Sequence, residues 1–217
     1  GRRYCWHVRA CRRNACSAWS RTRYLDVGRA AGDVDGDGFS DLVVGAPLID
    51  NGGRDRGSAF VYPGGPDGLR PATRLDEPQD LDGAAFGVGV AVADLDGDRF
   101  DDVVVGAAGE GDARGAVYVY FGGAAGISAP RQARLAQGAI ADDWFGATVA
   151  SPGDVDGDGV DEVAVAARGA DGEGVDWGVV QVYFGAPGLR DPDAREEKRP
   201  PLLLAAPAAR DYDGFGA

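Results

Sequence analysis

Three short segments of the sequence place acidic side chains at alternate positions. In each nine-residue segment, positions 1, 3, 5 and 9 are acidic. Four carboxylates this close together repel one another unless a cation lies among them, and hard oxygen ligands of this number suit Ca²⁺. We expect the backbone carbonyl at position 7 to be a fifth ligand. The predicted ligands are Asp33, Asp35, Asp37, Phe39 and Asp41 in the first segment, Asp94, Asp96, Asp98, Phe100 and Asp102 in the second, and Asp154, Asp156, Asp158, Val160 and Glu162 in the third.

The EF-hand is a competing interpretation because it also begins with alternate aspartates. An EF-hand needs a bidentate Glu at position 12 and a helix on each side. Position 12 is Val44, Val105 or Val165 here, inside β-rich runs, so the EF-hand is excluded in all three copies. Another alternative is that the segments are exposed Asp-Gly turns without a cation, which three copies in register make unfavourable.

The acidic segments belong to a longer repeat. Their first aspartates are 61 and 60 positions apart, and each segment is followed by two β-rich runs. The stretch from Phe86 to Ala93 and a weaker one near 131–137 add a first and a fourth strand to the unit. Val and Tyr favour strands, whereas Gly and Asp clusters favour turns. Each unit of about 60 residues is therefore predicted to form four strands.

This repeat predicts an all-β fold. No segment shows a sustained apolar period of 3.6 residues, so we expect little helix. Repeated four-stranded sheets that bury both faces against their neighbours are typical of the blades of a β-propeller. A two-sheet sandwich is the alternative, but sandwich sequences do not repeat at this interval.

The composition restricts the function. Of the 35 acidic residues, 29 are Asp, which favours turns over helices. Residues 31–217 carry a net charge of -20 and contain no His or Cys, which argues against nucleic-acid binding and excludes Ser-His-Asp or Cys-His catalysis there. We therefore expect no enzymatic activity. No apolar run approaches 18 residues, so we expect no membrane span in this segment.

The first 23 residues differ from the rest. They hold most of the eight Arg of residues 1–30 together with Cys5, His7, Cys11 and Cys16. The Cys and His spacing matches no common zinc site, and the odd number of Cys gives no disulfide framework. Contact with nucleic acid is a further alternative for the basic side chains. We expect residues 1–23 to be a linker or a disordered leader outside the fold.

Several motifs resemble those of a known family. Phe145-Gly146, the acidic segment that begins at Gly153-Asp154, and Gly45-Ala46-Pro47 are similar to the motifs of FG-GAP repeats, the blades of the integrin alpha-subunit β-propeller. The resemblance implies three four-stranded blades of a partial seven-bladed propeller, with up to three structural Ca²⁺ in the loops between strands one and two. The repeats would span about 24–84, 85–143 and 144–214, with a fourth beginning at 215.

The chain departs from this pattern at three places. Gly45-Ala46-Pro47 is matched only by Gly106-Ala107-Ala108 in the second unit and by Ala166-Ala167-Arg168 in the third. Arg99 replaces a glycine at position 6, so the second loop needs a left-handed backbone at a residue other than glycine. Tyr24-Leu25 stands where Phe-Gly is expected in the first unit.

The resemblance implies an extracellular or cell-surface binding module of the adhesion type, with protein or glycan ligands and with further blades supplied by the parent chain. The alternative is a non-catalytic propeller appended to a secreted hydrolase or another enzyme. Because the strands alternate in direction, we expect ligands on the face opposite the calcium loops, at residues 47–57, 107–114 and 167–177. Trp177 is the candidate anchor there, since Trp often dominates interface energies.

Overall fold

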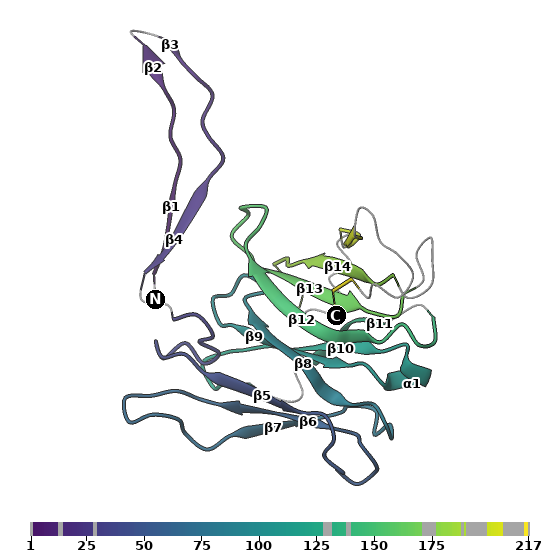
Figure 1. Ribbon diagram of the computed structural model, residues 1–217. Coiled ribbons are helices and arrows are strands. Elements are labelled where there is room, and N and C mark those ends of the chain that lie inside the picture. Colours follow the sequence, from purple (N-terminus) through teal and green to yellow (C-terminus); the bar gives the residue numbers. More distant parts are fainter. Residues whose placement is uncertain are drawn as a thin grey trace.

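The computed structural model describes residues 2–12, 15–27, 30–127, 132–137, 140–170, 177–187, 189, 199–205 and 215–216. Three antiparallel sheets lie side by side, and a long hairpin extends away from them (Figure 1). Within the described residues the only helix is the single turn α1 (Glu110–Ala113). The expectation of an all-β, blade-like chain with little helix is confirmed.

Each sheet is a meander in which strands that are consecutive in the sequence pair antiparallel. The middle sheet has all four predicted strands, and so has the third, whose last strand β15 follows a stretch of the chain that lies mostly outside the described residues. The first sheet contains β5 (Leu42–Ala46), β6 (Ser58–Tyr62) and β7 (Thr73–Asp76); the middle sheet contains β8 (Phe86–Ala93), β9 (Asp102–Ala107), β10 (Ala116–Tyr120) and β11 (Gln132–Gln137); and the third contains β12 (Phe145–Gly153), β13 (Glu162–Ala167), β14 (Val179–Phe184) and β15 (Leu202–Leu204).

Among the described residues, the first sheet lacks the first of the four strands that the repeat predicts. The segment that should supply it, β4 (Arg23–Val27), pairs instead with β1 (Arg2–Trp6) in the hairpin. The Phe-Gly motif distinguishes the later units from the first. Gly87 has a φ of +92°, and a Cβ atom there would lie 2.5 Å from the carbonyl oxygen of Ser58. Tyr24-Leu25 stands at the corresponding position of the first unit, so this segment lacks the motif by which the later units pack on the sheet before them.

The N-terminal arm forms a hairpin that lies apart from the three sheets (Figure 1). Beyond β1 and β4 it contains the short strands β2 (Cys11–Arg12) and β3 (Ala15–Cys16). A disulfide joins Cys11 to Cys16, and the rings of His7 and Trp19 pack edge to face with centroids 4.3 Å apart. Because the disulfide uses the thiols of Cys11 and Cys16, these two side chains cannot bind zinc together with Cys5 and His7.

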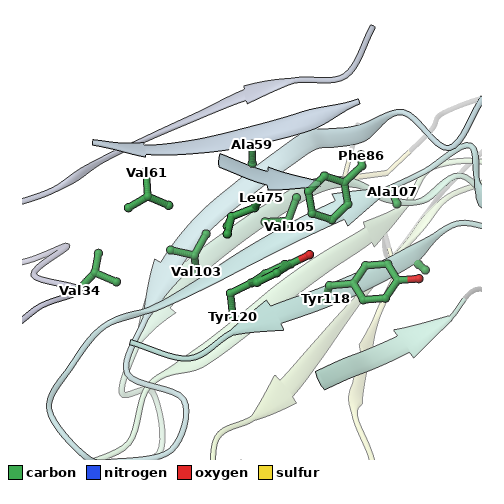
Figure 2. Packing of buried hydrophobic residues seen from close by; sticks show 11 residues of the cluster. Val34, Ala59, Val61, Leu75, Phe86, Val103, Val105, Ala107, Tyr118 and Tyr120 are labelled. Atoms are coloured by element: carbon green, nitrogen blue, oxygen red, sulfur yellow. The ribbon is translucent and has the colours of Figure 1, made fainter. Parts of the chain in front are cut away.

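The main cores lie between the sheets. In Figure 2, Val61 and Leu75 of the first sheet face Val103 and Tyr120 of the middle sheet across one such core. A second core joins the middle and third sheets around Phe145. Every residue of β9 and β10 is buried because the middle sheet is covered on both faces, which explains the continuous Val and Tyr runs.

The Phe-Gly motif of one sheet packs on the glycine that follows the apolar run of the sheet before it. A Cβ atom on Gly45 would lie 1.8 Å from the carbonyl oxygen of Gly87, and one on Gly106 would lie 2.0 Å from that of Gly146. We call each such contact between neighbouring sheets a joint, and hydrogen bonds reinforce it. The N–H groups of the motif phenylalanines donate to backbone carbonyls of the preceding unit: Phe86 to Arg56 at 2.9 Å, Phe145 to Arg114 at 3.2 Å and Phe215 to Trp177 at 2.7 Å.

We predict that Gly106→Ala destabilises the protein by about 1–3 kcal/mol, because the added methyl group overpacks the joint between the middle and third sheets. Gly65→Ala is the matched control, since its Cβ would approach no atom closer than 3.6 Å. Chemical denaturation of both variants measures the difference. Equal stabilities would contradict the close backbone approach.

Candidate metal centres

The three acidic segments are loops at the same end of the sheets. Loop 1 (33–41) leads into β5, loop 2 (94–102) joins β8 to β9, and loop 3 (154–162) joins β12 to β13. These are the positions between strands one and two that the repeat predicts. The equivalent strands of neighbouring sheets run side by side, so the loops follow one another along one edge of the molecule.

Each loop is curled by hydrogen bonds from its own backbone to its acidic side chains. The position-1 carboxylate accepts from the position-6 N–H, and the carboxylates at positions 3 and 5 each accept from the N–H two residues later. The position-1 bonds run from Gly38 to Asp33 at 2.9 Å, from Arg99 to Asp94 at 3.0 Å and from Gly159 to Asp154 at 2.9 Å. The same pattern in three loops shows that the spacing itself determines the local conformation.

The position-6 residue has a left-handed backbone in every loop. Its φ is +93° at Gly38, +95° at Gly159 and +76° at Arg99. The expectation that the second loop holds a non-glycine residue in this conformation is confirmed. The strain at Arg99 costs roughly 1–2 kcal/mol, so the loop closes in spite of it.

The structure brings together three acidic side chains in each loop. One oxygen from every member of a group lies within 4.8 Å of the others. Loops 1 and 2 contribute positions 1, 3 and 5, whereas loop 3 contributes positions 1, 3 and 9, so Asp158 falls outside its group. The groups are Asp33, Asp35 and Asp37; Asp94, Asp96 and Asp98; and Asp154, Asp156 and Glu162. The carbonyls of Phe39, Phe100 and Val160 stay predicted ligands.

The position-9 carboxylates of loops 1 and 2 have a bracing role that the sequence pattern did not reveal. Asp41 accepts from the N–H of Val34 at 2.8 Å and of Gly64 at 2.7 Å. Asp102 makes the equivalent bonds to Leu95 and Gly122, both at 3.0 Å. The position-9 carboxylate therefore ties the acidic loop to the glycine that follows the third strand. That glycine recurs after the Val-Tyr run of every unit. Its recurrence is the feature of the sequence from which this pairing could have been predicted.

Glu162 is the clearest indication of a cation. Its side chain is fully buried, its Oε2 atom accepts from the N–H of Val155 at 2.6 Å, and its Oε1 atom has no hydrogen-bond partner among the described residues. An unsatisfied buried acceptor is costly. Burial, followed by the neighbouring Asp156 and Asp158 carboxylates, raises the pKa of Glu162 to about 7. A divalent cation would satisfy this oxygen and relieve the repulsion.

The other loops show the same electrostatic strain. Burial and the nearby Asp96 carboxylate raise the pKa of Asp102 to about 8. Burial likewise raises the pKa of Asp41 and that of Asp158. Each loop therefore holds more negative charge than its surroundings stabilise, and the all-oxygen ligand sets fit a hard divalent cation.

Arginine side chains lie against two of the loops. The Nη2 atom of Arg70 is 2.7 Å from Asp35 and 2.8 Å from Asp37, and Nη1 of Arg199 is 2.7 Å from Asp156. Arg70 belongs to the connection between β6 and β7, so this connection and loop 1 share one end of the sheet, as the alternation of strand direction requires. These pairs are partly exposed, and such pairs contribute little stability.

The opposite end of the sheets carries the loops expected to bind ligands. Within residues 107–114, Glu110 is buried, accepts the hydroxyl hydrogen of Tyr118 at 2.7 Å and pairs with Arg134. Gln79 of the first unit donates to the Tyr118 hydroxyl at 2.9 Å. This network fixes the loop between β9 and β10. Of the third expected loop, residues 171–176 lie outside the described residues, and Trp177 lies at the joint with the fourth unit.

Comparison with known proteins agrees with this geometry. The FG-GAP repeat family model matches residues 30–62 and 86–120, which hold loops 1 and 2 and the strands around them. The chain contains FG-GAP repeats. Loop 3 and its strands repeat the same geometry.

The chain is also similar to integrin alpha subunits. It is 38% identical over 149 residues to integrin alpha-4 of Xenopus laevis, an alignment that covers 66% of this chain and 14% of the relative. The identity to human integrin alpha-11 is 36% over 141 residues, which is 63% of this chain and 12% of the relative. The identity to integrin alpha-5 of Xenopus laevis is 32% over 158 residues, which is 68% of this chain and 15% of the relative. The chain thus spans a small part of the relatives it matches. None of the helices described in the chain has the length and apolar character to cross a membrane.

We predict that Asp156→Asn combined with Asp158→Asn removes one bound Ca²⁺ and leaves the other two sites filled, because the three groups are separate. Native mass spectrometry in Ca²⁺ counts the ions. Asp67→Asn combined with Asp112→Asn removes the same charge outside the loops and serves as the control. Loss of all the ions, or of none, would contradict the assignment of loop 3.

Proposed function

We propose that the chain is a Ca²⁺-stabilised β-propeller segment of an extracellular or cell-surface binding module of the adhesion type. The observation that carries the proposal is the threefold recurrence of one acidic loop geometry along tandem sheets, in a chain similar to integrin alpha subunits. The same similarity favours a binding module over a propeller appended to an enzyme.

The role of Ca²⁺ in this proposal is structural. The acidic groups at positions 1, 3 and 5 of loops 1 and 2, and at positions 1, 3 and 9 of loop 3, would hold it, with the position-7 carbonyls as further ligands. The ion supplies positive charge and satisfies buried oxygens such as Oε1 of Glu162. The residues of the chain supply the curl of each loop, which their hydrogen bonds already impose.

The ligand surface would lie at the other end of the sheets. Residues 47–57 and 107–114 connect the second and third strands there, away from the carboxylates. The second of these loops is anchored by the buried Glu110 network, and Leu48 in the first is 72% exposed. A pre-organised loop favours the binding of a protein or glycan ligand, since less freedom is lost on binding.

Further blades of the parent chain are the other proposed partners. Leu42 and Val44 of β5 are 45% and 40% exposed. They correspond by strand register to Val103 and Val105 of β9, which are fully buried against the first sheet. A preceding blade of the same kind would cover the face of the first sheet in the same way.

The disulfide of the arm supports an extracellular location. Disulfides persist in oxidising environments and are rare in the cytosol, and the Cys11–Cys16 pair lies on exposed strands. Extracellular Ca²⁺ modules bind the ion with dissociation constants of roughly 10⁻⁴–10⁻³ M, and we expect the same range here.

We predict that Ca²⁺ raises the midpoint of thermal unfolding and that a chelator reverses the shift. Free Ca²⁺ at 100 times the dissociation constant, about 10–100 mM for a site of this class, would stabilise the folded state by about 2.7 kcal/mol per site. Differential scanning calorimetry with Ca²⁺, with chelator and with an equal concentration of Mg²⁺ measures the effect, and Mg²⁺ should shift the midpoint less. No shift at millimolar Ca²⁺ would disprove the calcium proposal.

We also predict that Leu48→Ala weakens ligand binding. Leu69→Ala is the matched control, because Leu69 is 57% exposed but lies at the end of the acidic loops. Biolayer interferometry of the chain against immobilised extracellular-matrix proteins and arrayed glycans identifies a ligand and compares the two variants. Weaker binding by Leu69→Ala alone would place the ligand on the calcium face and contradict the proposal.

A further inference from the structure

A carboxylate from loop 2 reaches across the joint into loop 1. The Oδ2 atom of Asp101 accepts from the N–H of Gly32 at 2.6 Å and from that of Asp33 at 3.0 Å. In return, the N–H of Asp101 donates to the carbonyl oxygen of Asp33 at 3.0 Å. Asp101 is at position 8 of loop 2, next to a predicted ligand. Its hydrogen bonds, however, bind the backbone of position 1 in loop 1.

The second joint repeats this arrangement. The Oδ2 atom of Asp161 accepts from the N–H of Asp94 at 3.1 Å, and the N–H of Asp161 donates to the carbonyl oxygen of Asp94 at 3.0 Å. Asp161 is at position 8 of loop 3, and Asp94 is at position 1 of loop 2. Two independent joints therefore use the same residue type, at the same position and in the same direction.

The side chain at position 7 follows the same direction. A Cβ atom on Gly36 of loop 1 would lie 2.5 Å from the ring of Phe100 in loop 2, and one on Gly97 of loop 2 would lie 3.1 Å from Val160 in loop 3. Loops 1 and 2 are thus each covered by the loop that follows in the sequence. Asp33 and Asp94 at position 1 are consequently buried, whereas Asp154 of loop 3 is exposed.

We propose that the position-8 aspartates, Asp101 and Asp161, are positioning residues for the cation site of the preceding blade, so that neighbouring sites are coupled in one direction along the chain. The inference rests on the proposed Ca²⁺ binding. The Asp33 carboxylate can bind an ion in a fixed position only if the backbone of Asp33 is fixed. The hydrogen bonds of Asp101 fix the N–H groups of Gly32 and Asp33 and the carbonyl group of Asp33. Asp161 does the same for Asp94.

The first loop supplies a natural contrast. Its position 8 is Ser40, which has no carboxylate to offer to a loop before it. The coupling therefore runs from loop 3 to loop 2 and from loop 2 to loop 1. Each position-8 aspartate is expected to matter to the loop before its own, which separates the inference from a general contribution to folding.

Hydrogen–deuterium exchange at increasing Ca²⁺ concentration gives a binding midpoint for each loop from the peptides that cover it. In Asp101→Ala, we expect the midpoint of loop 1 to rise about tenfold, as for the loss of about 1.4 kcal/mol, with loops 2 and 3 unchanged. Asp101→Asn keeps an acceptor oxygen and should restore most of the affinity. Asp161→Ala should raise the midpoint of loop 2 alone, and Ser40→Ala should change none.

The outcomes separate the two proposals. An effect of Asp101→Ala on loop 2 instead of loop 1, an equal effect on all three loops, or no effect would overturn the directional coupling while leaving Ca²⁺ binding intact. If no loop of the unaltered chain responds to Ca²⁺, the calcium proposal fails and the coupling fails with it. Exchange without Ca²⁺ provides a further check, because Asp101→Ala should expose the amides of Gly32 and Asp33 even there; continued protection would also overturn the inference.

Discussion

Each sheet of this protein depends on the sheet beside it, because both faces of its strands are apolar. The middle sheet shows the consequence most clearly, with every residue of β9 and β10 buried between two neighbours. Burial at about 25 cal/mol per Å² makes such contacts the main source of stability. The close approach of Gly45 to Gly87 and of Gly106 to Gly146 sets the spacing between the sheets, and this spacing brings consecutive acidic loops into contact.

The acidic loops oppose this packing, because their carboxylates repel one another and several are buried. Three kinds of contact stabilise the carboxylates. Backbone N–H groups within each loop donate hydrogen bonds to them, and Arg70 and Arg199 form ion pairs with loops 1 and 3. The position-9 carboxylate of loop 1 also binds the connection that follows the third strand. These devices hold the loops in one shape but leave Glu162 Oε1 unsatisfied. The same arrangement that makes the loops unfavourable without an ion makes them suited to one.

Much of the fold could be predicted, because a repeat displays the same physical requirement several times. The strand from Phe86 to Ala93 and the strand near 131–137 were expected from the repeat unit and are present as β8 and β11. The left-handed backbone at Arg99 followed from its alignment with Gly38 and Gly159. The arm could not be predicted, because residues 1–23 have no counterpart elsewhere in the chain. Its disulfide and the pairing of β4 with β1 are decided by contacts within the hairpin.

The sequence by itself determined the curl of each acidic loop and the order of the strands, since both depend on interactions between residues close in the chain. Only the tertiary structure decided which groups serve which loop. Asp101 lies in loop 2 but binds the backbone of loop 1, 68 and 69 residues away, and Asp41 is joined to Gly64. Such pairings arise when neighbouring sheets and connections pack together, so no spacing within a single loop reveals them.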